Sequence, residues 1–219
     1  MTRRTAGCVS SASAVNVARR VYAKLSQAAE SQGMADQRRR MLAGLAGEVV
    51  EIGAGNGLHF AHYPQAVTVV HAFEPDPYLR GLAARAADDA PVPVKVGDAV
   101  AEDVSLEDAS VDAAVASLVL CSVRDPGRAI AEPHRIVRPG GALRFNEHVV
   151  SQRPLGRALQ KTADATIWPT LAGGCHLGRD THTALIDGGF GIERVERFVF
   201  SVSALDPPKT HILGTARRL

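Results

Sequence analysis

The stretch VVEIGAGNG, residues 49–57, constrains the fold more than any other part of the sequence. Two valines and an isoleucine lead directly into three closely spaced glycines, which indicates a buried strand that ends in a tight turn. When such a turn opens into a helix, free backbone N–H groups gather at the positive end of that helix. The stretch therefore predicts a strand–turn–helix unit that binds a nucleotide-type cofactor.

Short apolar segments alternate with helical patterns along most of the chain. Strands are expected at residues 48–52, 67–73, 92–96, 111–120 and 142–150. Helices are expected at 78–89 and 126–137, where Pro133 predicts either a kink or a later start. Such alternation predicts βαβ units and a parallel sheet. Two later strands, at about 191–200 and 209–216, are expected to pair antiparallel at one edge.

The chain of 219 residues is long enough to bury a core of its own. No repeat or low-complexity linker divides it, so we expect one domain at residues 14–219 after a disordered tip at residues 1–13. Helical spacing predicts two helices within residues 14–45, with a break near Gly33. An insertion at about 150–190 precedes the last two strands.

Composition excludes several classes of protein. The formal net charge is only +2, which does not favour a nucleic-acid partner, and no segment reaches the ~18 apolar residues that span a bilayer. Cys8, Cys121 and Cys175 are far apart, and no CxxC pair or His/Cys cluster indicates a metal site. We therefore expect a cytoplasmic protein without a metal. The first 29 residues contain no Asp or Glu, which leaves an organelle-targeting segment as the alternative.

The spacing of the glycines separates the candidate cofactors. A dinucleotide fingerprint needs a glycine at position 58, where this chain has Leu58 after Gly53, Gly55 and Gly57. No Lys-Ser/Thr pair follows, so the turn is not a P-loop. Glu51, two residues before the first glycine, would repel a diphosphate but suits the ammonium and sulfonium groups of S-adenosylmethionine. A nicotinamide oxidoreductase is thereby disfavoured.

Two more acids close predicted strands at the edge where open α/β sheets bind ligands. Glu74 lies 17 residues beyond Gly57 and can accept hydrogen bonds from both ribose hydroxyls. Asp98, in VGDA, can accept from an adenine amino group, and the Ala99 N–H can donate to the ring. Together with the turn, these acids predict an S-adenosylmethionine site.

In these motifs the chain resembles the class I S-adenosylmethionine-dependent methyltransferases of the type 11 methyltransferase-domain kind. The resemblance covers about residues 15–217 and rests on VVEIGAGNG, FEPDPYL, VGDA, SVDAAVASLVLCSV and RIVRPGG in that order. It implies an α/β fold with a Rossmann-like seven-stranded sheet, mostly parallel with an antiparallel last strand, and helices on both faces.

A narrower resemblance rests on LVLCSV, RPGGALRFNEHV and GGCHLGRDTHTALIDGGF. These segments are similar to the small-molecule thiol S-methyltransferases of the methyltransferase-like group and to their bacterial relatives. The chain is expected to depart from that group in the hydrophobic membrane-anchoring segment with which the animal proteins begin, since residues 1–29 show no such segment. It departs again at Asn146, where relatives often carry an aromatic or apolar residue.

The resemblance also implies which residues contact the cofactor. Its roles carry over to the residues Glu51, Gly53, Ala54, Gly55, Gly57, Glu74, Pro75, Asp98 and Ala99. Ser117 and Leu118 correspond to positions that line the methionine part of S-adenosylmethionine. Tyr22, on the N-terminal helix, is expected either to close over the cofactor's carboxylate end or to pack in the ordinary way.

The chemistry is expected at the carboxyl ends of the fourth and fifth strands. Glu147 and His148 end the fifth strand, and His148 is the candidate general base. The alternative is that one of the two points into the sheet and satisfies backbone groups. A thiol acceptor, with a pKa near ~8.5, needs only modest help to lose its proton.

Candidate substrate contacts lie after the fourth strand and in the insertion, which we expect to be a substrate lid. They are Cys121, Trp168, Cys175 and His176. For Cys121 the alternative is a small buried hydrophobe, and for Trp168 it is a core position. The sequence thus predicts an enzyme that methylates a small molecule by in-line displacement, with a thiol as the first candidate acceptor. One alternative is a methyltransferase that acts on a lipid, quinone-like or amine acceptor. Another is a non-catalytic module that binds S-adenosylmethionine.

Overall fold

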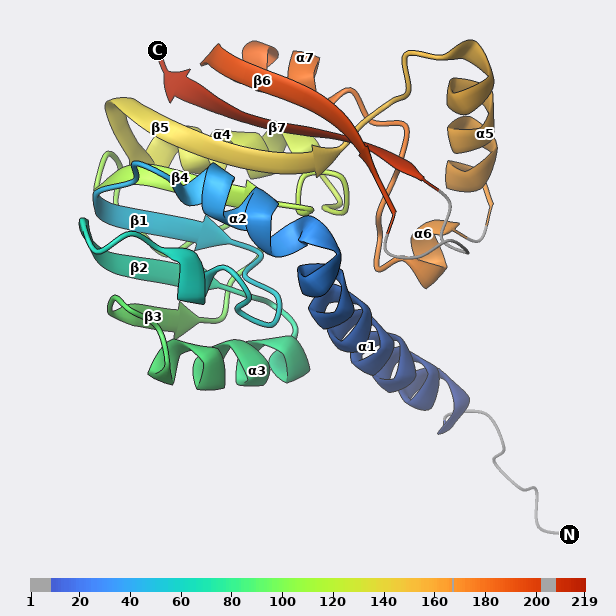
Figure 1. Cartoon of the computed structure of the whole chain (residues 1–219), viewed down its shortest axis with the longest axis horizontal. Helices are drawn as coiled ribbons and strands as arrows, with labels where there is room; N and C mark the ends of the chain where they lie inside the picture. Colours follow the sequence, from blue (N-terminus) through green and yellow to red (C-terminus); the bar gives the residue numbers. More distant parts are fainter. Residues whose placement is uncertain (1–8, 167, 202–207) are drawn as a thin grey trace, which may run out of the picture.

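All strands in the described part of the chain belong to one mixed sheet. The computed structural model describes residues 9–166, 168–201 and 208–219 (Figure 1). The sheet has seven strands in the order β3-β2-β1-β4-β5-β7-β6. Their bounds are Gly47–Ile52 (β1), Val67–Phe73 (β2), Val94–Gly97 (β3), Val111–Ser117 (β4), Val137–His148 (β5), Phe190–Phe200 (β6) and Lys209–Arg218 (β7). Only β7 runs antiparallel to its neighbours, β5 and β6, which confirms the predicted fold class.

Helices cover both faces of this sheet. They are α1 (Val9–Ala29), a π-helical turn (Glu30–Met34), α2 (Ala35–Leu42), a 3₁₀ turn (Phe60–His62), α3 (Pro77–Asp88), α4 (Pro126–Ile136), α5 (Pro154–Asp164), α6 (Trp168–Leu171) and α7 (Thr181–Asp187). Proline opens α3, α4 and α5, as its fixed φ and missing N–H favour. Asp76 and Asp125 cap α3 and α4 by accepting backbone N–H groups.

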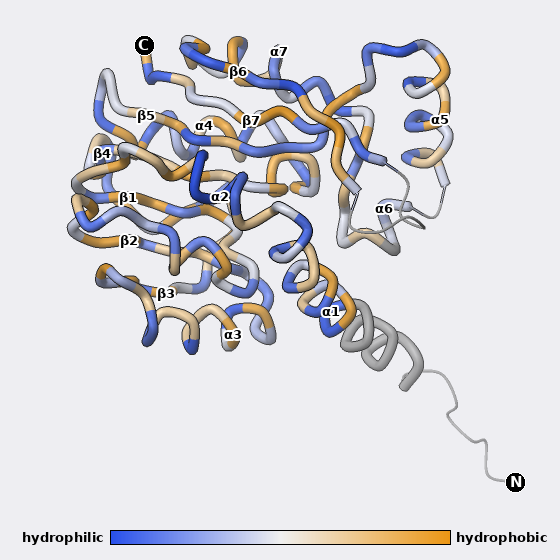
Figure 2. Tube along the Cα trace, viewed as in Figure 1, coloured by the Kyte–Doolittle hydropathy of each residue, from blue (hydrophilic) through white to orange (hydrophobic). Residues whose placement is uncertain are grey.

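Two apolar layers sandwich the sheet. One face packs against α4 and α7, with Ile130 and Leu185 fully buried. The other packs against α2 and α3, with Met41 and Ala83 fully or almost fully buried. The central strands β1 and β4 are mostly buried and are rich in valine, isoleucine and alanine. Figure 2 contrasts them with the hydrophilic α2.

Several boundaries differ from the sequence-based prediction. The helix expected from residue 14 begins at Val9, and residues 1–8 lie outside the described part. The break near Gly33 is confirmed, since φ there is +108° inside the π-helical turn. β4 ends at Ser117 instead of residue 120, because Leu118 takes a φ of +59° and turns the chain out of the sheet. Pro133 lies inside α4, which continues through it to Ile136.

The carboxyl ends of β1 to β5 all point toward the same side, where α1 and α6 lie (Figure 1). The insertion between β5 and β6 carries α5, α6 and α7. Within the described residues, no helix combines the length and the apolar character that crossing a membrane requires. The sheet thus brings the predicted site residues to one edge.

Candidate functional site

The glycine turn follows β1 directly and has the backbone shape that glycine permits. Gly53, Gly55 and Gly57 have φ values of +64°, +58° and +78°, a region that other residues rarely adopt. A Cβ at Gly53 would overlap with a methyl group of Val119, in the loop after β4. The turn therefore needs glycine both for its shape and for contact with that loop. Ala54, within it, is buried at 6% exposure.

Glu51 lies beneath this turn as a buried charge. It is 1% exposed, and its two carboxylate oxygens accept from the Tyr63 hydroxyl at 2.7 Å and from His59 Nδ1 at 2.8 Å. Arg38 lies 3.0 Å from the other ring nitrogen of His59, and burial lowers the pKa of His59. Each oxygen thus has one donor within the protein, and the carboxylate is almost fully buried. The geometry thus favours an electrostatic role for Glu51, acting on the turn from below.

Glu74 and Asp98 lie at the ends of β2 and β3, as predicted. Glu74 is 6% exposed and accepts from the backbone N–H groups of Gly55 at 2.8 Å and Asp76 at 2.9 Å. Burial raises the pKa of its carboxyl group. The Asp98 side chain is 66% exposed and pairs with Arg80 at 3.0 Å. Pro75 is exposed and Ala99 partly buried, beside these acids.

Helix α1 closes the turn from above. The Tyr22 hydroxyl lies 3.5 Å from the position that a Cβ on Gly55 would occupy, and Asn56 donates to Ser26 at 3.1 Å. Tyr22 as a whole is 45% exposed, but its hydroxyl end faces the protein, where burial raises its pKa. The turn, the acids and this tyrosine fit a cofactor with a cationic amino-acid end, a ribose and an adenine. Tyr22 therefore lies where closure over the cofactor was expected.

The loop after β4 is held by a carboxylate from β5. Glu147 is fully buried, and its oxygens accept the backbone N–H groups of Val119, Leu120 and Cys121, each at 3.0 Å. These hydrogen bonds match the alternative expected for one of the pair, a residue that satisfies backbone groups. Ser117 and Leu118, just before the loop, are partly buried at the end of β4.

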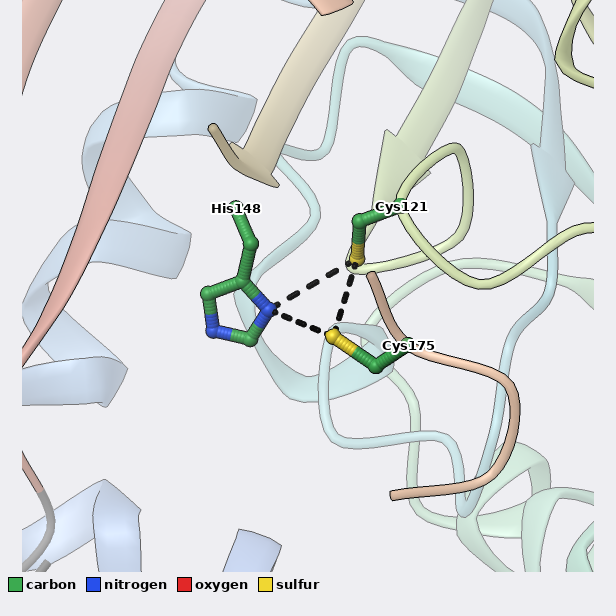
Figure 3. A group of neighbouring side chains, drawn as sticks. All are labelled: Cys121, His148 and Cys175. Atoms are coloured by element: carbon green, nitrogen blue, oxygen red, sulfur yellow. Dashed lines mark hydrogen bonds between the residues drawn. The ribbon is translucent and has the colours of Figure 1, made fainter. Parts of the chain in front are cut away.

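His148, the next residue, turns the opposite way and meets two cysteines (Figure 3). Its Nδ1 lies 3.1 Å from Cys175 Sγ and 3.6 Å from Cys121 Sγ, and the two sulfurs are 3.8 Å apart. Both cysteines are buried and free. We call these three side chains the Cys–His–Cys cluster. It joins the loop after β4, the end of β5 and the insertion.

Electrostatics separate the two thiols of this cluster. The hydrogen bond between Cys175 and Cys121, together with His148, lowers the pKa of Cys175 to about 5, against the opposing effect of burial. The bond to Cys175, then burial, raises the pKa of Cys121 well above its usual range. The contact between the two sulfurs therefore shifts the two pKa values in opposite directions.

The insertion is fixed against the loop after β4 by its backbone. The N–H of His176 donates to the carbonyl of Cys121 at 2.7 Å. Gly174, with φ of +91°, leaves room for the Ser122 carbonyl, which would lie 2.6 Å from a Cβ there. These contacts place Cys175 beside Cys121. Gly174 thus serves close packing of this segment.

Arg179 is a site residue that the sequence did not reveal. Its guanidinium donates to the Leu120 carbonyl at 2.6 Å and contacts His176 Nδ1 at 3.3 Å. The same His176 nitrogen lies 2.7 Å from the Gly174 carbonyl. The His176 ring is thus engaged within the insertion, although the sequence placed it among the substrate contacts. An arginine in a variable insertion carries no motif that could have identified it.

Trp168 begins α6 at the same edge. It is partly buried, and Lys209 Nζ lies 5.6 Å from its ring centroid. Its indole nitrogen is buried without a hydrogen-bond partner of ordinary geometry among the described residues, although it is near enough to Cys175 to help lower the pKa of that thiol. Trp168 therefore lies at the border of the site and not in the core.

The folded chain brings together a His/Cys cluster that no spacing in the sequence indicates. His148 lies 27 positions from each cysteine, so no local spacing could bring the three together. The topology supplies a partial signal, because β4 and β5 are neighbours whose carboxyl ends meet. From this strand order alone, Cys121 and His148 could be predicted to lie close together. Nothing in the sequence places Cys175 against them.

Comparison with known proteins accords with this geometry. The methyltransferase domain family matches residues 50–145. Human thiol S-methyltransferase TMT1B is 32% identical over 180 residues, which cover 80% of this chain and 73% of the relative. Human thiol S-methyltransferase TMT1A is 30% identical over 171 residues, which cover 77% and 69%.

A solved structure of a putative methyltransferase from Bacillus halodurans shares the fold. Its TM-score is 0.69 over 84% of this chain and 97% of that chain, at 14% sequence identity. The glycine turn, the acids at the ends of β2 and β3 and the strand order are thus explained together. The chain belongs to the methyltransferase-domain family, and it is an enzyme that depends on S-adenosylmethionine.

Proposed function

We propose that the protein methylates the sulfur of a small-molecule thiol. Support comes from the printed activity of its human relatives, which are thiol S-methyltransferases at 32% and 30% identity. The observation that carries the proposal is the position of His148 at the carboxyl edge of β5, beside the loop that contacts the glycine turn. S-adenosylmethionine, when bound, supplies a methyl group on a sulfonium that is already a good leaving group.

The protein's own part is then binding, orientation and exclusion of water. We assign ribose binding to Glu74 and adenine binding to Asp98, with Glu51 providing negative charge beneath the cationic end. Tyr22 covers that end on the solvent side. Glu51 and Glu74 are 1% and 6% exposed, and this burial strengthens their electrostatic interactions with a bound cofactor.

Of the predicted catalytic pair, Glu147 and His148, only one residue is free to take the proton of the acceptor. Glu147 is occupied by three backbone donors, which leaves His148. A thiol with a pKa near ~8.5 is already partly ionised at neutral pH, so a weak base is sufficient. An ammonium or alcohol would need a stronger base at this edge. The chemistry of the described residues therefore favours sulfur over nitrogen or oxygen.

The test is release of S-adenosylhomocysteine by the purified protein with a panel of small thiols and matched amines and phenols. Turnover with thiols alone supports the proposal. Turnover with amines or lipid-like phenols instead would establish one of the alternative acceptors. Binding of S-adenosylmethionine without turnover on any acceptor would indicate a non-catalytic module. A Glu74→Gln control must lose turnover together with cofactor affinity.

A further inference from the structure

The atoms of the Cys–His–Cys cluster have the spacing of metal ligands. Zinc bonds of about 2.3 Å to sulfur and about 2.05 Å to nitrogen, in a tetrahedron, separate two sulfurs by about 3.8 Å and sulfur from nitrogen by about 3.6 Å. The sulfurs of Cys121 and Cys175 are 3.8 Å apart, and His148 Nδ1 lies 3.6 Å and 3.1 Å from them. All three ligand atoms lie within 4.8 Å of one another. They point toward a common centre in Figure 3.

We propose that Cys121 Sγ, Cys175 Sγ and His148 Nδ1 bind one Zn²⁺ ion whose fourth coordination position receives the sulfur of the acceptor. Two thiolates and an imidazole are ligands that zinc prefers, whereas magnesium and calcium prefer oxygen. Three protein ligands with one open position are typical of a catalytic zinc site. The inference rests on the proposed function for the identity of the fourth ligand, but not for the metal itself.

Contacts outside the cluster hold each ligand in place. Glu147 fixes the loop that carries Cys121 through three backbone hydrogen bonds. The bond from the His176 N–H to the Cys121 carbonyl fixes the segment that carries Cys175. Such outer contacts normally orient metal ligands. The site is therefore assembled by the fold before any ion binds.

A disulfide explains the cluster less well. It would bring the two sulfurs from 3.8 Å to about 2.05 Å, and it gives no role to a histidine that faces both. Two thiolates at the present distance repel each other, and a divalent cation between them removes that repulsion. A bound metal therefore explains why all three side chains lie together, whereas a disulfide explains only the two cysteines.

The cluster lies next to the cofactor turn. Val119, two residues before Cys121, packs against Gly53, so that a Cβ on this glycine would overlap with it. Tyr22 lies over Gly55 and is near enough to both cysteines for their charges to affect its pKa. A sulfur held at the fourth position would thus lie on the side where the cofactor is expected to present its methyl group.

The step that follows balances without another reactant. The thiol loses its proton to water as it binds the metal, because coordination deprotonates a thiol. A sulfur lone pair then forms the new S–CH₃ bond as the sulfonium C–S bond breaks, giving a neutral thioether and S-adenosylhomocysteine. The thioether is a weaker ligand than the thiolate and leaves. His148 acts here as a ligand, and the metal replaces it as the means of removing the proton.

The first experiment measures the metal on the full-length protein, without a histidine tag and in a phosphine reductant. We expect about one zinc per chain after purification without chelators. After zinc is removed, Co²⁺ should bind with about the same stoichiometry and give a thiolate-to-cobalt charge-transfer band. Cys121→Ser, Cys175→Ser and His148→Ala should each weaken Co²⁺ binding by more than about a hundredfold. Cys8→Ser is the matched thiol control and should bind as the parent protein does.

Thermal unfolding of each variant identifies any that fails to fold. If one does, the charge-transfer band of the parent protein still decides, because only thiolate ligands produce it. Absence of stoichiometric Co²⁺ binding by the reduced, folded parent would overturn the inference. So would a Cys121→Ser protein that binds Co²⁺ as the parent does.

The second experiment adds 2-mercaptoethanol, or ethanolamine as control, to the Co²⁺ protein. A shift of the charge-transfer band with the thiol alone is expected. Thiol methylation by zinc-depleted protein at the parental rate would overturn the metal's role and leave the proposed function standing. Stoichiometric metal binding without thiol turnover would leave the metal site standing and contradict the proposed function.

Discussion

The buried carboxylate of Glu147 offers a direct test of how the fold holds the site. It accepts three backbone N–H groups, from Val119, Leu120 and Cys121, each at 3.0 Å. Hydrogen bonds to a charged group contribute about 1.5–3 kcal/mol each. A Glu147→Gln substitution keeps one oxygen, which can still serve Val119 and Leu120. Its amide group would face the N–H of Cys121, donor against donor.

The expected cost follows from that mismatch. A backbone donor left unpaired in the core costs about 1–3 kcal/mol. Loss of the buried charge offsets part of this, since burial already raises the pKa of Glu147. We expect Glu147→Gln to lower the free energy of unfolding by about 2 kcal/mol, a large share of a typical 5–15 kcal/mol. It should also weaken Co²⁺ binding by about ten- to a hundredfold, as loss of an outer contact does.

Urea unfolding, followed by circular dichroism, measures the first effect, and cobalt titration the second. The matched control is Glu102→Gln. Glu102 also accepts two backbone N–H groups, from Arg124 and Asp125, but at the exposed surface, and its change should stay within about 0.5 kcal/mol. Equal, small effects for both variants would refute the idea that Glu147 holds the Cys121 loop.

Three further predictions test other parts of the site. Glu74→Gln removes one charge-assisted acceptor and should raise the Kd for S-adenosylmethionine by roughly ten- to a hundredfold, measured by calorimetry; an unchanged Kd would contradict the ribose assignment. Gly53→Ala should destabilise the protein by about 1–3 kcal/mol more than Gly140→Ala in urea, because both have positive φ but only Gly53 faces a side chain that blocks a Cβ; equal losses would remove the steric argument. Burial, then nearby positive charges, lowers the pKa of His211 to about 3, so between about pH 6.5 and 3 the unfolded chain binds a proton that the folded chain does not. Stability should therefore fall as the pH drops through that window, and more steeply than in His211→Phe; parallel pH profiles would contradict the assignment.

The sequence predicts the sheet because each strand carries its own local signal. Residues 67–73 were expected to form a strand and do so with the same bounds. The cofactor half of the site was predictable for the same reason, since its residues follow single strands at recognisable spacings. Errors arise where tertiary contacts override local pattern. Residues 118–120 were expected to continue the strand, yet Leu118 has a positive φ, and the N–H groups of Val119 and Leu120 bind the carboxylate of Glu147 instead of a neighbouring strand.

The substrate half was less predictable because its residues meet only in three dimensions. Cys121 and Cys175 are 54 positions apart and come from a loop and an insertion. Glu147 and His148 are adjacent, and the sequence could not say which one faces inward. Strand alternation places them on opposite sides, and the structure shows that Glu147 is the one that binds the backbone. The roles of such pairs depend on register, which one sequence does not specify.

The central claim, that the acceptor is a thiol, is tested most directly by competition. Equal concentrations of benzenethiol, phenol and aniline are incubated with the protein and S-adenosylmethionine, and the methylated products are identified by mass spectrometry. Uncatalysed methylation in the same mixture is subtracted. The account predicts methyl phenyl sulfide as the dominant product. Methylation of phenol or aniline at a comparable rate would contradict it.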